Sequence, residues 1–259
     1  MNPLLDFSGL PKFGDIRPGN VEPAIERLLA EAREALAAVT QPDVPVRWEE
    51  FIAPLEDANE RLARAWGQVS HLHAVLDSPE LREAYNAVLP RVTQYWTELG
   101  QNQALFEKYR ALHASAGFEG LTPARKRIVH NALRDFRLGG AELPADEKRR
   151  FAEIQEELAS LSARFSENVL DATNAFSLTL EDASRVAGIP ADELSVAREA
   201  AQKDGKQGWK FTLHAPSYVP VMQYAADRAV REAMYRESVT RASEFGKPEW
   251  DNTPLIERI

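Results

Sequence analysis

Apolar side chains recur at steps of three or four residues over most of this 259-residue chain, the spacing of one face of an α-helix. The longest such pattern covers residues 146–176 and contains neither glycine nor proline. At about 1.5 Å per residue it predicts a helix roughly 45 Å long. We expect the apolar stripe of this helix to face the preceding helices as the organising core element: Phe151, Ile154, Leu158, Leu161, Phe165, Val169, Ala172 and Phe176.

Shorter helical patterns precede the long one, and prolines mark their starts. Proline suits the first helical turn, where its missing N–H costs nothing, so residues 20–23, 78–79 and 122–123 predict helix starts. Residues 139–140 (GG) predict the end of the helix that begins at 122. Pro90 lies inside a helical pattern and predicts a kink or a break.

Several large side chains on these shorter helices are candidate core residues. Aromatic residues on helical stripes are more often packed than ligand-binding. We expect the helix from residue 122 to bury Ile128, Val129, Leu133 and Phe136, and the earlier helices to pack Trp48, Phe51, Trp66 and Trp96.

The apolar period then changes from helix to strand. Phe176, Leu178 and Leu180 alternate with polar residues, and so do Trp209, Phe211 and Leu213. We predict that the two strands pair antiparallel, with a helical insert at residues 191–202 between them. One further helix is expected to carry the apolar residues from Val221 to Met234.

These elements predict a mainly α fold: a helical array with one long helix and a small antiparallel β-hairpin. Three regions follow: residues 1–175, 176–215 and 216–259. A helix start near Asn252, Thr253 and Pro254 stands close to the end of the sequence, and we interpret the chain as a piece of a longer protein. Such a piece would expose apolar side chains near its end: Met222, Val230, Met234, Leu255 and Ile256.

Composition narrows the functional classes. The formal charge of −9 and the isoelectric point near 5.2 disfavour nucleic acid as a partner. The chain has no cysteine, which excludes disulfides and thiolate chemistry and fits the cytoplasm. No stretch approaches the roughly 20 apolar residues of a membrane span, so we expect no membrane partner.

Candidate catalytic and metal-binding residues are few. The HExxH zinc motif is absent, and His71 and His73 lie two residues apart, which on a helix places them on different faces. His214 precedes Ser217, but no nucleophile elbow surrounds the pair. We therefore predict no catalytic, cofactor-binding or metal-binding residue in this chain. Tyr218, in the segment 217–222 (SYVPVM), is the candidate for presentation to a groove, with ordinary packing as the alternative.

Several segments together resemble the N-terminal part of the thimet-oligopeptidase family of zinc metallopeptidases. The resemblance runs in order through essentially the whole chain and includes residues 2–5 (NPLL), 78–85 (SPELREAY), 131–136 (NALRDF), 165–173 (FSENVLDAT), 216–222 (PSYVPVM) and 231–236 (REAMYR). It implies the N-terminal portion of the oligopeptidase channel fold, in which helices form one wall of a deep channel.

The resemblance also implies a function for the whole protein. It would be a cytoplasmic zinc endopeptidase that cleaves short peptides, including signal-peptide fragments, with its zinc ligands in a C-terminal catalytic part. The partners of this chain would be that remaining part and the peptide substrates, and the chain alone would be an inactive channel wall. The alternative hypothesis is a free-standing helical protein-interaction scaffold.

Overall fold

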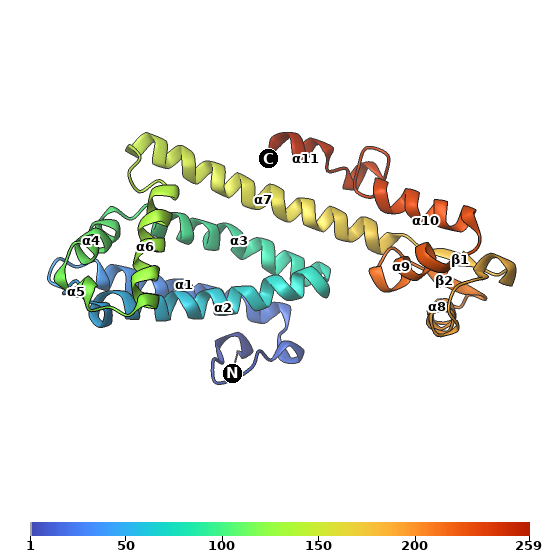
Figure 1. Cartoon of the computed structure of the whole chain (residues 1–259), viewed down its shortest axis with the longest axis horizontal. Helices are drawn as coiled ribbons and strands as arrows, with labels where there is room; N and C mark the ends of the chain where they lie inside the picture. The colour runs from blue at the N-terminus through green and yellow to red at the C-terminus, as the bar shows by residue number, and fades with distance from the viewer. Residues whose placement is uncertain (1) are drawn as a thin grey trace. The chain divides into compact units, whose positions relative to one another are not determined.

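The computed structural model describes residues 2–259, which contain eleven α-helices and one two-stranded sheet (Figure 1). The protein is therefore mainly α-helical, as the sequence predicts. The chain forms two compact units, of which the first ends at Ser160 and the second begins at Leu161. This boundary falls inside the longest helix, α7 (Ala145–Ala175). The three regions 1–175, 176–215 and 216–259 stay a prediction.

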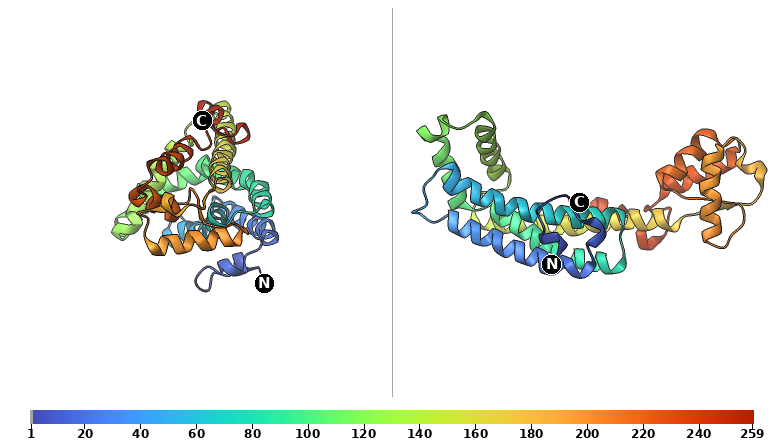
Figure 2. Two further views of the ribbon diagram at one scale, coloured as in Figure 1. Left: turned by 90° about the vertical axis from the view of Figure 1, so that its right-hand side faces the viewer. Right: turned by 90° about the horizontal axis from the view of Figure 1, so that it is seen from below.

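Three helices build the first core of unit 1. They are α1 (Pro18–Val39), α2 (Ala53–Val75) and α3 (Pro79–Gly100), which lie side by side in Figures 1 and 2. A short π-helical turn, Trp48–Ile52, leads into α2. Apolar side chains from all three helices are buried together, among them Ile25, Leu28, Leu62, Val88 and Tyr95. Each helix thus buries one stripe and leaves its polar face outside, as its periodicity predicts.

A second core in unit 1 joins α4 (Gln103–His113), α5 (Ala116–Glu119) and α6 (Pro123–Leu138). Phe106 and Tyr109 of α4 each lie 5.5 Å, between ring centroids, from Phe136 of α6. Val129 and Leu133 are buried as predicted, but Ile128 is 39% exposed. The prediction for Ile128 was wrong, since it precedes the buried Val129 in sequence and adjacent helical positions point in different directions.

Helix starts and stops follow the prolines and glycines of the sequence. The Ser78 hydroxyl accepts a hydrogen bond from the Leu81 N–H at 3.2 Å and the Thr122 hydroxyl accepts one from the Arg125 N–H at 3.3 Å. Gly140 has a φ of +88°, which suits a helix end. α3 nevertheless continues through Pro90, so the predicted break is absent and the kink stays a prediction. A missing N–H removes a single ladder bond, and the turns on both sides remain helical.

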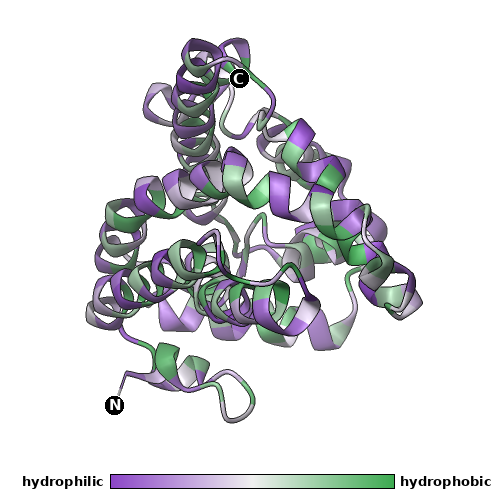
Figure 3. Cartoon of the chain, turned by 90° about the vertical axis from the view of Figure 1, so that its left-hand side faces the viewer, coloured by the Kyte–Doolittle hydropathy of each residue, from purple (hydrophilic) through white to green (hydrophobic). Residues whose placement is uncertain are grey.

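The long helix α7 matches the prediction in length but not in burial. Among the described residues of α7, only Asn168 is buried. Most of the predicted apolar stripe is only half-buried, Ile154 is 38% exposed, and no residue of α7 belongs to the three apolar cores. Figure 3 shows apolar and polar residues alternating along the helices. The expected role of the stripe as a core element was therefore wrong, because periodicity identifies an apolar face without supplying a partner for it.

Unit 2 is built around the predicted hairpin. β1 (Leu178–Leu180) pairs antiparallel with β2 (Trp209–Phe211), with Leu180 opposite Trp209, and α8 (Ala191–Lys203) is inserted between them. The predicted C-terminal helix is two helices, α9 (Ala215–Tyr224) and α10 (Arg228–Thr240). The chain leaves the helical path because the Asp227 carboxylate accepts the Ala229 N–H at 2.8 Å and starts α10, while the Ala226 N–H donates to the Ala187 carbonyl at 2.8 Å.

The final helix, α11 (Thr253–Arg258), begins where the sequence predicts, although the side chain of its N-cap residue, Asn252, makes no capping hydrogen bond. The Thr253 N–H donates to the Asp251 carboxylate at 2.9 Å. The Asn252 side chain is buried and instead accepts a hydrogen bond from Asn168 at 2.8 Å and donates to the Phe165 carbonyl at 3.1 Å.

Burial near the end of the chain differs from the expected exposure. Val230 and Met234 are fully buried in the apolar core of unit 2, and Leu255 is only 7% exposed. Met222 is half-buried, and Ile256 alone of the five is largely exposed, at 62%. The prediction for Val230, Met234 and Leu255 was wrong, and for Val230 and Met234 the reason is that the apolar core of unit 2 encloses them.

Candidate functional site

His71 and His73 lie on different faces of α2, as their spacing predicts. His71 is exposed, while His73 is buried with its ring stacked on Tyr85 at 4.1 Å between centroids. Across residues 2–259 the structure shows no group of three or more His, Asp or Glu side chains placed to hold one metal ion.

His214 and Ser217 lie at the start of α9. His214 is the exposed N-cap residue of this helix. The Ser217 hydroxyl accepts a hydrogen bond from the Thr212 N–H at 2.9 Å, which connects the strand end to the helix. This hydrogen bond explains the serine as a local turn residue.

Tyr218 lies on α9 and is half-buried. Its ring packs against the apolar core of unit 2, and its neighbours on the same helix, Val219 and Tyr224, are 42% and 52% exposed. An aromatic ring that is packed on one side and accessible on the other suits a contact with an apolar or peptide ligand. The contact of Tyr218 with peptide stays a prediction.

Polar contacts fix the corner that connects α9 to α10. Arg185 donates to the Asp227 carboxylate at 3.0 Å, and this hydrogen bond, together with that from the Ala229 N–H, lowers the pKa of Asp227. Arg231 donates to the carbonyls of Ala225 and Ala226. Two side chains of α10, Tyr235 and Val239, are 54% and 55% exposed. These hydrogen bonds hold the corner, and the helices on its two sides carry the partly exposed side chains of Tyr224 and Tyr235.

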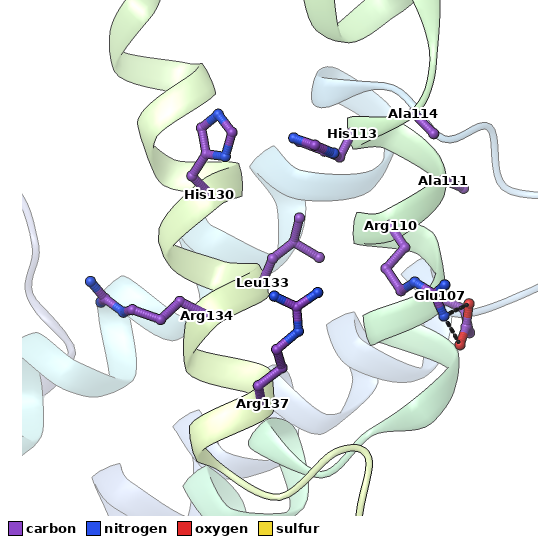
Figure 4. Close-up of a pocket in the computed structure, with 9 residues that line it drawn as sticks. All are labelled: Glu107, Arg110, Ala111, His113, Ala114, His130, Leu133, Arg134 and Arg137. Atoms are coloured by element: carbon purple, nitrogen blue, oxygen red, sulfur yellow. Dashed lines mark hydrogen bonds and ion pairs between the residues drawn. The ribbon is translucent and has the colours of Figure 1, made fainter.

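A cavity of about 580 Å³ lies between α4 and α6 and was not predicted from the sequence (Figure 4). Helical spacing contains a signal for it, because positions i, i+3, i+4 and i+7 of each helix contribute to the lining. Those positions are Glu107, Arg110 and Ala111 on α4, Ala114 directly after it, and His130, Leu133, Arg134 and Arg137 on α6; His113 completes the lining. In the sequence, arginines on a polar helix face are indistinguishable from ordinary surface charge, and only the packing of α4 against α6 shows that they line a cavity.

None of the helices in residues 2–259 combines the length and the apolar character that crossing a membrane requires.

A family of known proteins matches most of the first unit. Residues 25–149 match the family described as Neurolysin/Thimet oligopeptidase, N-terminal domain. The matched residues include α1 to α6 almost entirely and therefore most of both cores of unit 1.

Curated relatives extend the likeness over the whole chain. The chain is 44% identical to oligopeptidase A of Haemophilus influenzae and 36% identical to the probable cytosolic oligopeptidase A of Arabidopsis thaliana, in both cases over 100% of its length. It is 27% identical to the dipeptidyl carboxypeptidase of Salmonella typhimurium, again over 100% of its length. The chain spans 37–38% of the length of these relatives.

Proposed function

We propose that this chain is an N-terminal region of the neurolysin and thimet oligopeptidase family and forms the non-catalytic channel wall of a peptide-cleaving enzyme. In this role its helices restrict access, so that only short, unstructured peptides reach the catalytic part. The remaining C-terminal part of the same protein is then its structural partner, and short peptides, including signal-peptide fragments, are the substrates. We place the enzyme in the cytoplasm.

The observation that carries this proposal is the identity of 36–44% to proteins named oligopeptidase A, which extends over the whole chain. A likeness confined to residues 25–149 would concern one helical domain only. Because the likeness includes unit 2, both compact units are expected to serve the same enzyme.

A zinc cofactor belongs to the proposal for the whole protein and not to these residues. The family resemblance implies a zinc endopeptidase, but the described residues offer no cluster of three ligands, and the sequence lacks HExxH and cysteine. The residues present do not fit a catalytic zinc ion. We therefore propose that the metal ligands lie in the C-terminal part and that this chain alone is inactive.

A quenched fluorescent oligopeptide tests the inactivity. The purified chain should leave the peptide intact, whereas the full-length protein should cleave it and should lose this activity to a chelator. Cleavage by the chain alone that disappears in His214→Ala would contradict the proposal and reveal a site at the start of α9. A parent reading frame that lacks an HExxH segment would favour the interaction-scaffold alternative.

Tyr218 gives a second test in the full-length protein. If its ring contacts peptide, Tyr218→Ala should raise KM about two- to tenfold, the magnitude of one lost aromatic contact, and leave kcat unchanged. Tyr235→Ala is the matched control, since it removes an exposed tyrosine from α10. Equal effects of the two variants would show that Tyr218 has no special role in binding.

A further inference from the structure

The cavity between α4 and α6 is lined by several arginines, although the protein is acidic. Its lining includes Arg110, Arg134 and Arg137 with a single carboxylate, that of Glu107, although the whole chain has a formal charge of −9. His113 and His130 add two groups that gain positive charge when protonated. Guanidinium groups gathered in a concave site can bind an anion that displaces their internal carboxylate partners.

The walls of this cavity are held by a packed core. Behind the lining, Phe106 and Tyr109 of α4 contact Phe136 of α6, and Leu133 is buried between the helices. At the other end, the rings of His113 and His130 lie 5.0 Å apart and both contact Phe118 of α5, at 4.8 and 5.4 Å. The backbones of the two helices that carry Arg110 and Arg137 are therefore held at a fixed separation.

The side chains divide the cavity into two ends, as Figure 4 shows. Arg110 and Arg137 lie at one end on opposite walls, and His113 and His130 face each other at the other end, with Leu133 between them. Arg134 points away from the centre and pairs with Asp135 at 2.7 Å. The arrangement combines two guanidinium groups, an apolar middle and a pair of flat imidazole rings.

The internal partners of the two arginines restrict the class of ligand. Arg110 pairs with Glu107 at 3.1 Å and Arg137 contacts Glu142 at 3.9 Å, and all four side chains are more than half exposed. Exposed ion pairs are weak and exchange readily. A single carboxylate ligand would gain nothing over these internal carboxylates, whereas an anion of higher charge that reaches both guanidinium groups would replace them.

We propose that the α4–α6 cavity binds a small anion with two linked phosphate groups, which Arg110 and Arg137 hold from opposite walls. Guanidinium groups match phosphate oxygens in pairs, and a volume of about 580 Å³ exceeds what one phosphate needs. The diphosphate group belongs either to free diphosphate or to a nucleoside diphosphate. In the second case the base packs against the outer side of the His113 and His130 pair, whose rings already contact each other at 5.0 Å.

Calorimetric titration of the 259-residue chain with inorganic diphosphate, at low salt and without divalent metal, tests the proposal. We expect saturable binding of one diphosphate, with affinity that falls as salt rises. Arg110→Gln and Arg137→Gln should each weaken binding about tenfold, the size of one charge-assisted interaction. These exposed side chains can be replaced without opening a core.

Arg150→Gln is the matched control. Arg150 forms an exposed i,i+3 pair with Glu153 at 3.1 Å, as Arg110 does with Glu107, but it lies on α7 outside the cavity. Diphosphate binding should be unchanged in this variant. Absence of saturable binding, or an equal loss in Arg150→Gln, would overturn the proposal.

Titration with adenosine diphosphate distinguishes the two sources of the group. Tighter binding than that of inorganic diphosphate, with the gain lost in His113→Ala, supports a nucleotide. Equal or weaker binding supports free diphosphate, provided that Arg137→Gln weakens the binding of inorganic diphosphate. Nucleotide binding that is insensitive to both Arg110→Gln and Arg137→Gln would contradict the assigned site.

Discussion

Gly208 stands where a side chain has no space. It has a φ of +84°, and a Cβ atom there would lie 2.1 Å from the Leu180 carbonyl oxygen of the paired strand. Gly205 has a similar φ of +69° but open space around it. A comparison of substitutions at Gly205 and Gly208 therefore distinguishes the cost of backbone strain from the cost of a steric clash.

We expect Gly205→Ala to reduce the free energy of unfolding by about 1–2 kcal/mol, the cost of a left-handed conformation for a residue with a Cβ atom. Gly208→Ala should cost more, because β1 and β2 must also move apart. Urea unfolding followed by circular dichroism measures both. Equal losses would show that the strand pair adapts without strain.

A buried pair of amides ties α7 to the segment before α11. Asn168 donates to Asn252 at 2.8 Å, and both side chains are buried, at 7% and 2% exposure. Asn252 also donates to the Phe165 carbonyl, so its amide serves two partners on one helix. Buried polar groups that lose such partners keep their desolvation cost.

Asn252→Ala should therefore lower the free energy of unfolding by about 1–3 kcal/mol, because it leaves the Asn168 amide buried without its partner. Asn174→Ala, at an exposed position of α7, is the control and should change little. The same denaturation experiment compares the two variants. A negligible effect of Asn252→Ala would indicate that water enters and satisfies Asn168.

At the scale of elements, α7 differs from the other long helices. α1, α2 and α3 each bury a stripe completely, whereas the stripe of α7 is half-buried and lies outside all three cores. Two leucines show this difference: Leu62 of α2 is fully buried, whereas Leu161 of α7 is half-buried. Their comparison measures how much α7 contributes to stability.

Leu62→Ala should reduce the free energy of unfolding by about 2–5 kcal/mol, as substitutions in closed cores do. Leu161→Ala should cost about 1 kcal/mol, because a half-buried side chain loses less transfer free energy and leaves no closed cavity. Chemical denaturation of both variants tests the difference. A loss as large for Leu161 as for Leu62 would show that the stripe is covered in solution.

For the whole molecule, large apolar side chains that remain exposed govern behaviour in solution. Near the end of the chain these are Phe245, 76% exposed, and Ile256, 62% exposed. Leu10, near the start, is 89% exposed. Exposed apolar groups that gather into patches promote association.

We predict that the isolated chain self-associates with rising concentration and binds a hydrophobic dye. Replacing both Phe245 and Ile256 by serine should reduce both signals, whereas Leu10→Ser, a single exposed side chain in another segment, should reduce them less. Light scattering and dye fluorescence provide the measurements. A monodisperse monomer that binds no dye would contradict the prediction.

Local rules in the sequence determined most elements. Helical periodicity, prolines such as Pro79 and Pro123, and the alternation around Leu178 and Phe211 set the helices and strands to within a few residues. These signals act over one or two turns, so neighbouring residues suffice to read them. Likewise, the motifs that follow one another in order along the chain are enough to indicate the family, because their order is a property of the sequence itself.

Only the tertiary structure decided what each apolar or polar face meets. It left the α7 stripe half-exposed, buried Val230 and Met234, turned Asn252 inward toward Asn168, and brought Arg110 opposite Arg137 across the cavity. In each case the deciding neighbour lies on another element. Periodicity specifies which side chains share a face, but the free energy of burial depends on the partner that covers it.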